Sequence, residues 1–258
     1  MGDDPSWPDQ ADTLRRLMGS RQDEVQGQLH LPRVSAKIPM FLFTALRERL
    51  GMSTLCQNLA LIFAREGDGT LLCVGSDKEK NARCQIIPRD KNLWINTNVW
   101  NVPTRSDAFP PDVNMILMDL GGTSQIMSSR FDPILVVPPE ESSVTQAASL
   151  LRWWHADCGI SRVGLVVSPV TEGPKGSELG RNLFVQIQNR VCQYFDARIR
   201  FLGHVVFNKQ GTPNSKYLID LYPSSVSARM MELIAKNMRI WREERLQEET
   251  APLLAPWN

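Results

Sequence analysis

The sequence contains few of the residues that would build a metal site, a disulfide framework or a membrane span. Its three histidines are scattered, and its five cysteines are odd in number and form no C-x-x-C pair. We therefore expect reduced thiols and no metal site. No apolar run approaches the roughly 18 residues that a membrane-spanning helix needs.

An excess of charge and a targeting segment are absent as well. The 29 Lys and Arg residues balance 28 Asp and Glu residues, giving a net charge of +1. This balance offers no overall electrostatic attraction for nucleic acid. The first ten residues, MGDDPSWPDQ, are acidic and polar, unlike a secretory or transit peptide. The expectation is a soluble, cytoplasmic protein.

What the sequence does contain is a regular alternation of short apolar runs with helical patterns. The apolar runs predict strands at about residues 38–43, 70–75, 113–118, 134–137, 163–167 and 201–207, with weaker signals at 84–87 and 93–100. Helical periodicity predicts helices at about 53–64, 144–154, 181–195 and 223–247. Because the clear strands are almost wholly apolar, they fit a sheet covered on both faces. The predicted fold class is α/β: a three-layer, mostly parallel sheet with helices on both faces.

The chain divides into three predicted segments. Residues 1–32 hold a short helix and a polar linker, residues 33–247 form the α/β domain, and residues 248–258 form a tail. The last helix has an apolar stripe, but its polar face mixes acidic and basic residues. Mixed charge of this kind argues against strong binding to anionic lipid, so membrane contact is expected to be weak at most.

The loop between the first strand and the first helix of the domain has the position of a phosphate-binding loop but little of its chemistry. Gly51 and Ser53 fit the pattern G-x-x-x-x-G-K-[ST], whereas Leu46 replaces the first Gly and Met52 replaces the Lys. Met has no charge and donates no hydrogen bond. Glu48 adds a carboxylate to a loop that should hold a polyanion. Ordinary ATP binding is therefore not expected unless Arg47 or Arg49 compensates.

Two carboxylates follow later strands. They stand where an NTPase with a phosphate-binding loop places its magnesium-binding carboxylate and its switch carboxylate. Asp119 closes the strand at 113–118 and precedes Gly121 and Gly122, as a Walker B carboxylate does. Asp77 follows the strand at 70–75. Taken alone, Asp119 could equally cap a turn.

With these pieces in order, the domain resembles the MinD/ParA family of deviant-Walker-A ATPases. The resemblance aligns the family loop KGGxGKST with residues 47–54, so Arg47 stands for the signature Lys, Met52 for the Walker Lys, and Ser53 and Thr54 for the hydroxyl pair. It also aligns Ser168 with the Asn that usually recognises adenine, and residues 75–77, 119–123, 139–145 and 222–231 with other family segments. By this resemblance the nucleotide site is vestigial. The vestigial nucleotide-binding positions are Arg47, Gly51, Met52, Ser53, Thr54 and Ser168. The vestigial metal-binding positions are Ser53 and Asp119, and the vestigial catalytic positions are Asp77 and Asp119.

The N-terminal segment 9–15, DQADTLR, resembles the DQAxxLR motif of FlhG/FleN-type flagellar-number regulators. In that branch the motif engages FlhF, a GTPase of the signal-recognition type. By carry-over, the partner-binding residues are Asp9, Gln10, Ala11, Leu14 and Arg15, with Gln10 the candidate for positioning a water. The alternative is that the helix at 9–19 packs on its own domain.

These observations predict a degenerate MinD/FlhG-like regulator, a pseudo-ATPase that binds proteins and controls flagellar or other polar-assembly placement or number. We expect no cofactor, with ATP and Mg²⁺ as the alternative, and no nucleic-acid partner. Expected partners are an FlhF-like GTPase or a related assembly protein, and a second copy or an intact MinD-like paralogue. The expected location is the cytoplasm, with the inner membrane or cell pole as a peripheral site. The competing hypotheses are an active or heterodimer-completed ATPase, and an accessory subunit of a secretion, pilus or polysaccharide-export machine.

Overall fold

The computed structural model describes residues 38–74, 86–96, 109–119, 131–193, 198–206 and 218–250. Within these residues eight strands form one sheet in the order β3-β4-β2-β5-β1-β6-β7-β8. All neighbouring pairs are parallel except β3 with β4. The strands are β1 (Met40–Ala45), β2 (Thr70–Val74), β3 (Ile86–Asp90), β4 (Leu93–Asn96), β5 (Met115–Asp119), β6 (Asp132–Val137), β7 (Arg162–Val167) and β8 (Arg198–His204). The predicted fold class is confirmed.

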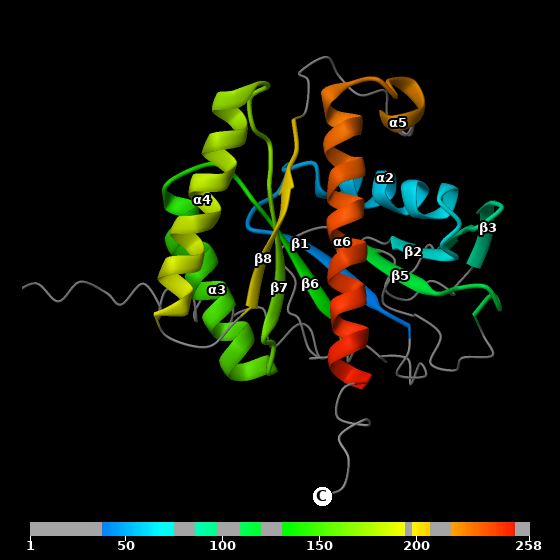
Figure 1. Cartoon of the computed structure of the whole chain (residues 1–258), viewed down its shortest axis with the longest axis horizontal. Coiled ribbons are helices and arrows are strands. Elements are labelled where there is room, and N and C mark those ends of the chain that lie inside the picture. Colours follow the sequence, from blue (N-terminus) through cyan, green and yellow to red (C-terminus); the bar gives the residue numbers. More distant parts are fainter. Residues whose placement is uncertain are drawn as a thin grey trace, which may run out of the picture.

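Helices cover both faces of the sheet (Figure 1). One face carries α3 (Ser142–Cys158) and α4 (Pro174–Cys192), and the other carries α2 (Met52–Arg65), α5 (Leu218–Leu221) and α6 (Val226–Thr250). Strand β1 lies between the two cores: Phe41 and Phe43 face the α2 and α6 side, whereas Met40 and Leu42 face the α3 and α4 side. This alternation explains why the run of apolar residues is continuous.

Helix α4 begins at Pro174, earlier than the predicted start at residue 181. The sequence TEGPKGSELG looks like a loop because of its three glycines, but Pro174 occupies the first helical position, which proline favours. Gly176 is needed for close packing, because a Cβ atom there would lie 1.8 Å from the carbonyl oxygen of Thr171. Two glycines of the predicted loop therefore lie inside the helix, at buried positions.

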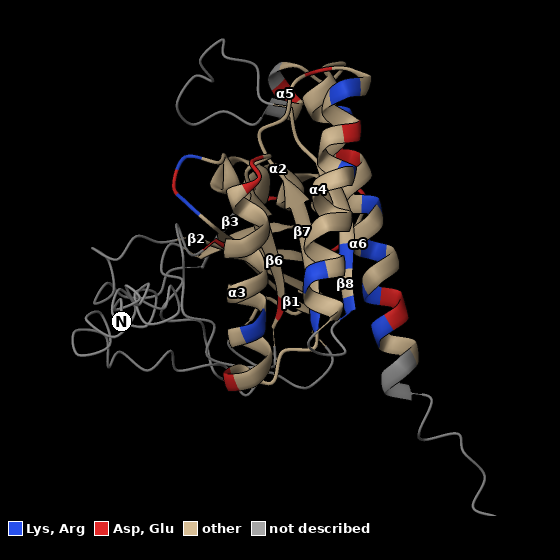
Figure 2. Cartoon of the chain, turned by 90° about the vertical axis from the view of Figure 1, so that its left-hand side faces the viewer, with Lys and Arg blue, Asp and Glu red and all other residues tan. Residues whose placement is uncertain are grey.

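Helix α6 crosses the sheet with an apolar face buried and three of its arginines paired to the rest of the domain. Met231, Ile234, Met238 and Trp241 are buried in the core, as their spacing predicts. Lys, Arg, Asp and Glu residues alternate along its outer surface (Figure 2). No helix in the described part of the chain is long and apolar enough to cross a membrane.

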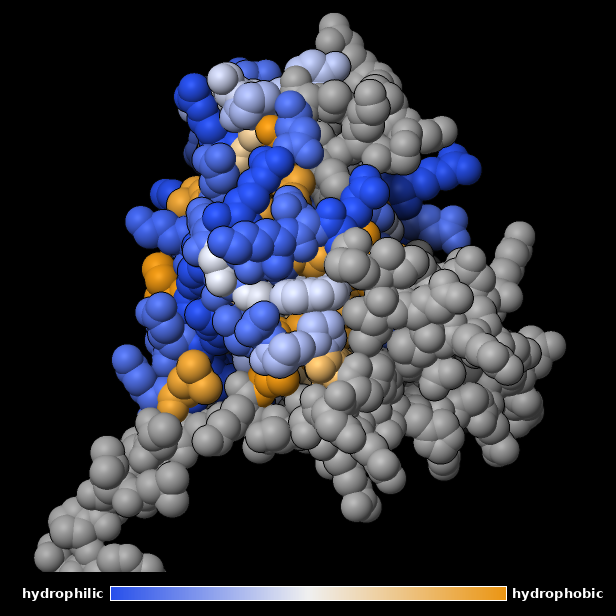
Figure 3. All heavy atoms as spheres, turned by 90° about the vertical axis from the view of Figure 1, so that its right-hand side faces the viewer, coloured by the Kyte–Doolittle hydropathy of each residue, from blue (hydrophilic) through white to orange (hydrophobic). Residues whose placement is uncertain are grey.

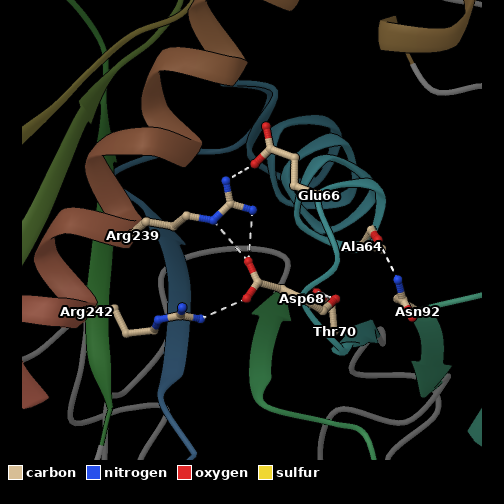
Figure 4. Close-up of polar contacts among 7 residues, drawn as sticks. All are labelled: Ala64, Glu66, Asp68, Thr70, Asn92, Arg239 and Arg242. Atoms are coloured by element: carbon tan, nitrogen blue, oxygen red, sulfur yellow. Dashed lines mark hydrogen bonds and ion pairs between the residues drawn. The ribbon is translucent and has the colours of Figure 1, made fainter.

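Arg239 and Arg242 of α6 both bind the carboxylate of Asp68, which precedes β2 (Figure 4). The distances are 2.8 Å from Arg239 Nη2 and 3.2 Å from Arg242 Nη1, and Arg239 also pairs with Glu66. Arg245 binds Asp132 at the start of β6, at 2.5 Å. These arginines therefore fix α6 against the amino-terminal ends of the strands, and they are not simply a solvated charged face.

On the face drawn in Figure 3, hydrophobic side chains of the described residues reach the surface as separate patches among hydrophilic ones. Scattered apolar side chains of this kind are normal for a protein surface. Among the described residues drawn in this view, no broad apolar surface is seen.

Candidate nucleotide-type loop

The loop that follows β1 lies at the carboxyl end of the fifth strand of eight, in the middle of the sheet. Its first residue is tied to the neighbouring strand, because the Leu46 amide donates to the carbonyl of Val136 in β6 at 3.1 Å. Ligands of open α/β sheets bind at this edge, outside the carboxyl ends of the strands. The strand, loop and helix that the sequence predicts are therefore present at this edge, and the phosphate-binding character of the loop stays a prediction.

The loop backbone has two left-handed residues. Gly51 has φ 73° and caps the start of α2, where its carbonyl accepts from the Leu55 amide at 2.9 Å. Ser53 and Thr54 lie within the first turn of the helix, and no side chain caps it. Arg49 has φ 64°, an unfavourable conformation for a residue with a side chain, which costs about 1–2 kcal/mol. The family loop carries a glycine at this position, so Arg49 adopts a backbone shape suited to glycine.

Met52, at the position of the Walker Lys, is a core residue. Its side chain is 5% exposed and belongs to the hydrophobic cluster that α2 and α6 share with the sheet. Leu50, two residues before it, is also buried. The first turn of α2 therefore presents a thioether to the core at the point where a nucleotide-binding loop presents an ammonium group.

Arg47, at the position of the signature Lys, forms a two-point ion pair with Glu140 just before α3. Its Nη1 and Nη2 atoms lie 3.0 and 2.5 Å from the two carboxylate oxygens. Both side chains are about half exposed, so the pair contributes at most about 1 kcal/mol to stability. The main consequence of the ion pair is that it holds the Arg47 guanidinium at Glu140.

Ser168, at the position of the adenine-binding Asn, is fully buried at the end of β7. Its hydroxyl donates to the carbonyl of Leu50 at 2.8 Å, and its amide donates to the carbonyl of Val137 at 2.9 Å. The Ser168 side chain therefore anchors the loop through the Leu50 carbonyl.

Asp119 is the last residue of β5 and is 5% exposed. It lies close enough to Cys56 of α2 to affect that thiol: burial first, and then the charge of Asp119, raise the pKa of Cys56 well above its usual value. Cys56 is therefore a protonated core thiol. Asp119 thus lies at the carboxyl end of β5, near Cys56 of α2.

A hollow of about 180 Å³ lies within the loop, lined by residues 45 and 47–54. Arg47, Glu48, Arg49 and Ser53 are its exposed lining residues, and Ala45, Leu50 and Met52 are buried ones. The structure thus brings together Arg47, Gly51, Met52, Ser53 and Thr54 around one space. In the parts of the chain that the structure describes, no three His, Cys, Asp or Glu residues gather as a metal site would require.

Several predicted site residues lie outside the described residues. These are the switch carboxylate Asp77 and the partner-binding residues Asp9, Gln10, Ala11, Leu14 and Arg15. Sequence reasoning missed the role of Glu140. Its place in the segment aligned with residues 139–145 was visible, but its contact with Arg47, 93 residues away, was not.

The mostly parallel sheet, the central strand-loop-helix and the helices on both faces form a three-layer α/β fold. Among solved structures the chain shares the fold of ParA and MinD ATPases. It matches a ParA family ATPase from Chlorobium tepidum TLS (14% identity, TM-score 0.54, covering 78% of this chain and 98% of the other). It also matches a chain of the MinC:MinD cell division protein complex of Aquifex aeolicus (16% identity, TM-score 0.56, covering 78% of this chain and 96% of the other). No protein-family model and no curated protein sequence matches the chain.

Proposed function

We propose that this chain is a regulatory protein of the MinD/ParA type that has lost its own ATP cycle and acts by binding proteins. The observation that carries the proposal is the buried Met52 side chain. A working loop needs a cation at that position to neutralise the β- and γ-phosphates, and here a thioether packs in the core.

Two further contacts support this proposal. Arg47 is already paired with Glu140, so it would have to leave that carboxylate before it could reach a phosphate or a second copy. Ser168 uses its hydroxyl on the Leu50 carbonyl. The residues present therefore do not fit ATP with Mg²⁺, although Asp119 and Gly51 keep their positions.

Isothermal titration of the full chain with ATP and Mg²⁺ tests the proposal. We expect no binding in the micromolar range and no hydrolysis. Micromolar binding, or ATP turnover that Asp119→Ala abolishes, would contradict the proposal and favour the alternative of an active ATPase. The alternative also includes an ATPase whose site is completed in a heterodimer. Repeating the titration in the presence of an intact MinD-like paralogue tests that form.

The setting that we propose is flagellar or other polar assembly, with the DQADTLR segment engaging an FlhF-like GTPase. Its support is the sequence motif at residues 9–15. We expect the full chain to accelerate GTP hydrolysis by such a GTPase and Gln10→Ala to remove the effect. Gln22→Ala, in the adjoining linker segment, is the matched control and should behave as the unaltered chain does. A GTPase that neither binds nor responds would exclude this partner.

A further inference from the structure

The last part of α6 is attached to the domain in a different way from the rest of the helix. Within residues 226–241 the helix buries an apolar face, whose last member is Trp241 at 3% exposed. Among the side chains that the structure describes after Trp241, at residues 242–247, none is buried. The one apolar residue of that stretch, Leu246, is 41% exposed. The burial of apolar side chains, which supplies most of the stability of helices in proteins, therefore stops at Trp241.

Ion pairs begin where this packing ends. Three of them tie one turn of the helix to the sheet or to the residue just before a strand: Arg242 with Asp68 (3.2 Å; Figure 4), Glu244 with Arg200, and Arg245 with Asp132 (2.5 Å). The helix continues to residue 250, beyond the last of these pairs. The end of α6 is therefore attached to the sheet through charged groups.

Water reaches these pairs to different extents. The Asp132 side chain, bound by Arg245, is only 7% exposed. The Glu244 side chain, bound to Arg200, is 48% exposed. Charges attract more strongly where water is excluded, and dissolved salt screens an exposed pair more than a sheltered one. Arg245 therefore contributes more than Glu244 to holding the end of the helix.

The carboxylate of Asp68 is sheltered as well, but it is shared between two arginines. Arg239, in the packed part of α6, binds it at 2.8 Å, in addition to Arg242. Asp68 therefore keeps a cation when Arg242 moves away. Release of Arg245, in contrast, takes a cation from the almost buried carboxylate of Asp132, and that loss is costly.

We propose that residues 242–250 form a strap that opens and closes independently while residues 226–241 stay packed, and that Arg245 is its clasp. Opening separates ion pairs and exposes none of the buried apolar side chains of α6, so salt favours the open form. A segment with few buried apolar contacts opens at a lower free energy than the core does. Nothing in this device involves nucleotide, so it is independent of the proposed function.

The test is hydrogen exchange of the full chain, followed by mass spectrometry, in 0.05 M and 1 M NaCl. We expect amides of residues 245–250 to exchange at least about tenfold faster than those of residues 231–238. Raising the salt should accelerate exchange in the strap by a further factor of roughly three to ten, because the Debye length shrinks to about 3 Å, and it should leave residues 231–238 unchanged.

Arg245→Gln tests the clasp. It should accelerate exchange at residues 245–250 roughly tenfold in 0.05 M NaCl, because it removes a charged hydrogen bond, and it should reduce the response to salt. Arg229→Gln, which changes an exposed arginine near the start of the same helix, is the matched control and should exchange as the unaltered chain does.

Four results would overturn the strap. Exchange at residues 245–250 as slow as at 231–238, or equal acceleration of both segments by Arg245→Gln, would show that α6 opens as one unit. Exchange that ignores salt, or that is the same in Arg245→Gln and Arg229→Gln, would show ordinary fraying of a helix end without a clasp. If Arg245→Gln does not fold, the salt titration of the unaltered chain decides alone.

Discussion

Replacing Met52 with Lys restores the residue that a phosphate-binding loop requires, and we expect it to damage the protein without restoring nucleotide binding. The Met52 side chain is 5% exposed within the core shared by α2 and α6. Burying a Met side chain fully contributes about 1.5–3 kcal/mol, part of which the aliphatic stem of Lys would keep. An ammonium without a partner in that core adds a further cost of a few kcal/mol.

The two effects sum to a loss of about 3 kcal/mol in the free energy of unfolding, a large share of the roughly 5–15 kcal/mol of an ordinary domain. The assay is urea unfolding of Met52→Lys with and without ATP and Mg²⁺. Met52→Leu, which keeps shape and polarity, is the control and should cost less than about 1.5 kcal/mol. The reasoning is refuted if Met52→Lys is as stable as Met52→Leu and ATP stabilises it. Nucleotide at a hundred times its Kd would add about 2.7 kcal/mol.

Three further changes test the loop and its surroundings. Arg49→Gly should raise the free energy of unfolding by about 0.5–1 kcal/mol in urea, because glycine tolerates φ 64°; an equal gain in Arg49→Ala would show that backbone strain is not the cause. Ser168→Ala should lower that free energy by about 1–3 kcal/mol, because it leaves the Leu50 carbonyl without its buried donor; an unchanged unfolding midpoint would argue against this hydrogen bond. Burial, and then Arg181, lower the pKa of His204 below 6.5, so the unfolded chain takes up the proton first. Stability should therefore fall as pH drops below about 6.5, and the fall should be smaller in His204→Gln; identical pH profiles would contradict that role.

The sheet was predictable from the sequence because its strands are continuous apolar runs buried on both faces. The alternation of Phe41 and Leu42 between two cores requires such a run, and so does the complete burial of Val166. The start of α4 was not predictable, because its glycines are there for close packing against Thr171 and His204, which only the tertiary structure brings near.

The candidate site was predictable in position but not in its contacts. The spacing of Gly51 and Ser53 after an apolar run indicates a loop at the carboxyl end of a central strand, and the structure has it there. The spacing does not predict that Arg47 pairs with Glu140, or that Ser168 binds the Leu50 carbonyl 118 residues away. Long-range polar contacts depend on which strands become neighbours, and the pattern of single residues does not encode that order.

We propose a loop that keeps the backbone of a nucleotide site while its side chains serve the core and the surface. A crystal structure of the full chain grown with Mg²⁺ and a non-hydrolysable ATP analogue tests this most directly. We expect Met52 to be packed in the core, Arg47 to be paired with Glu140 and the hollow to contain no nucleotide. Density for phosphates and magnesium within the loop, with Arg47 turned toward them, would contradict it.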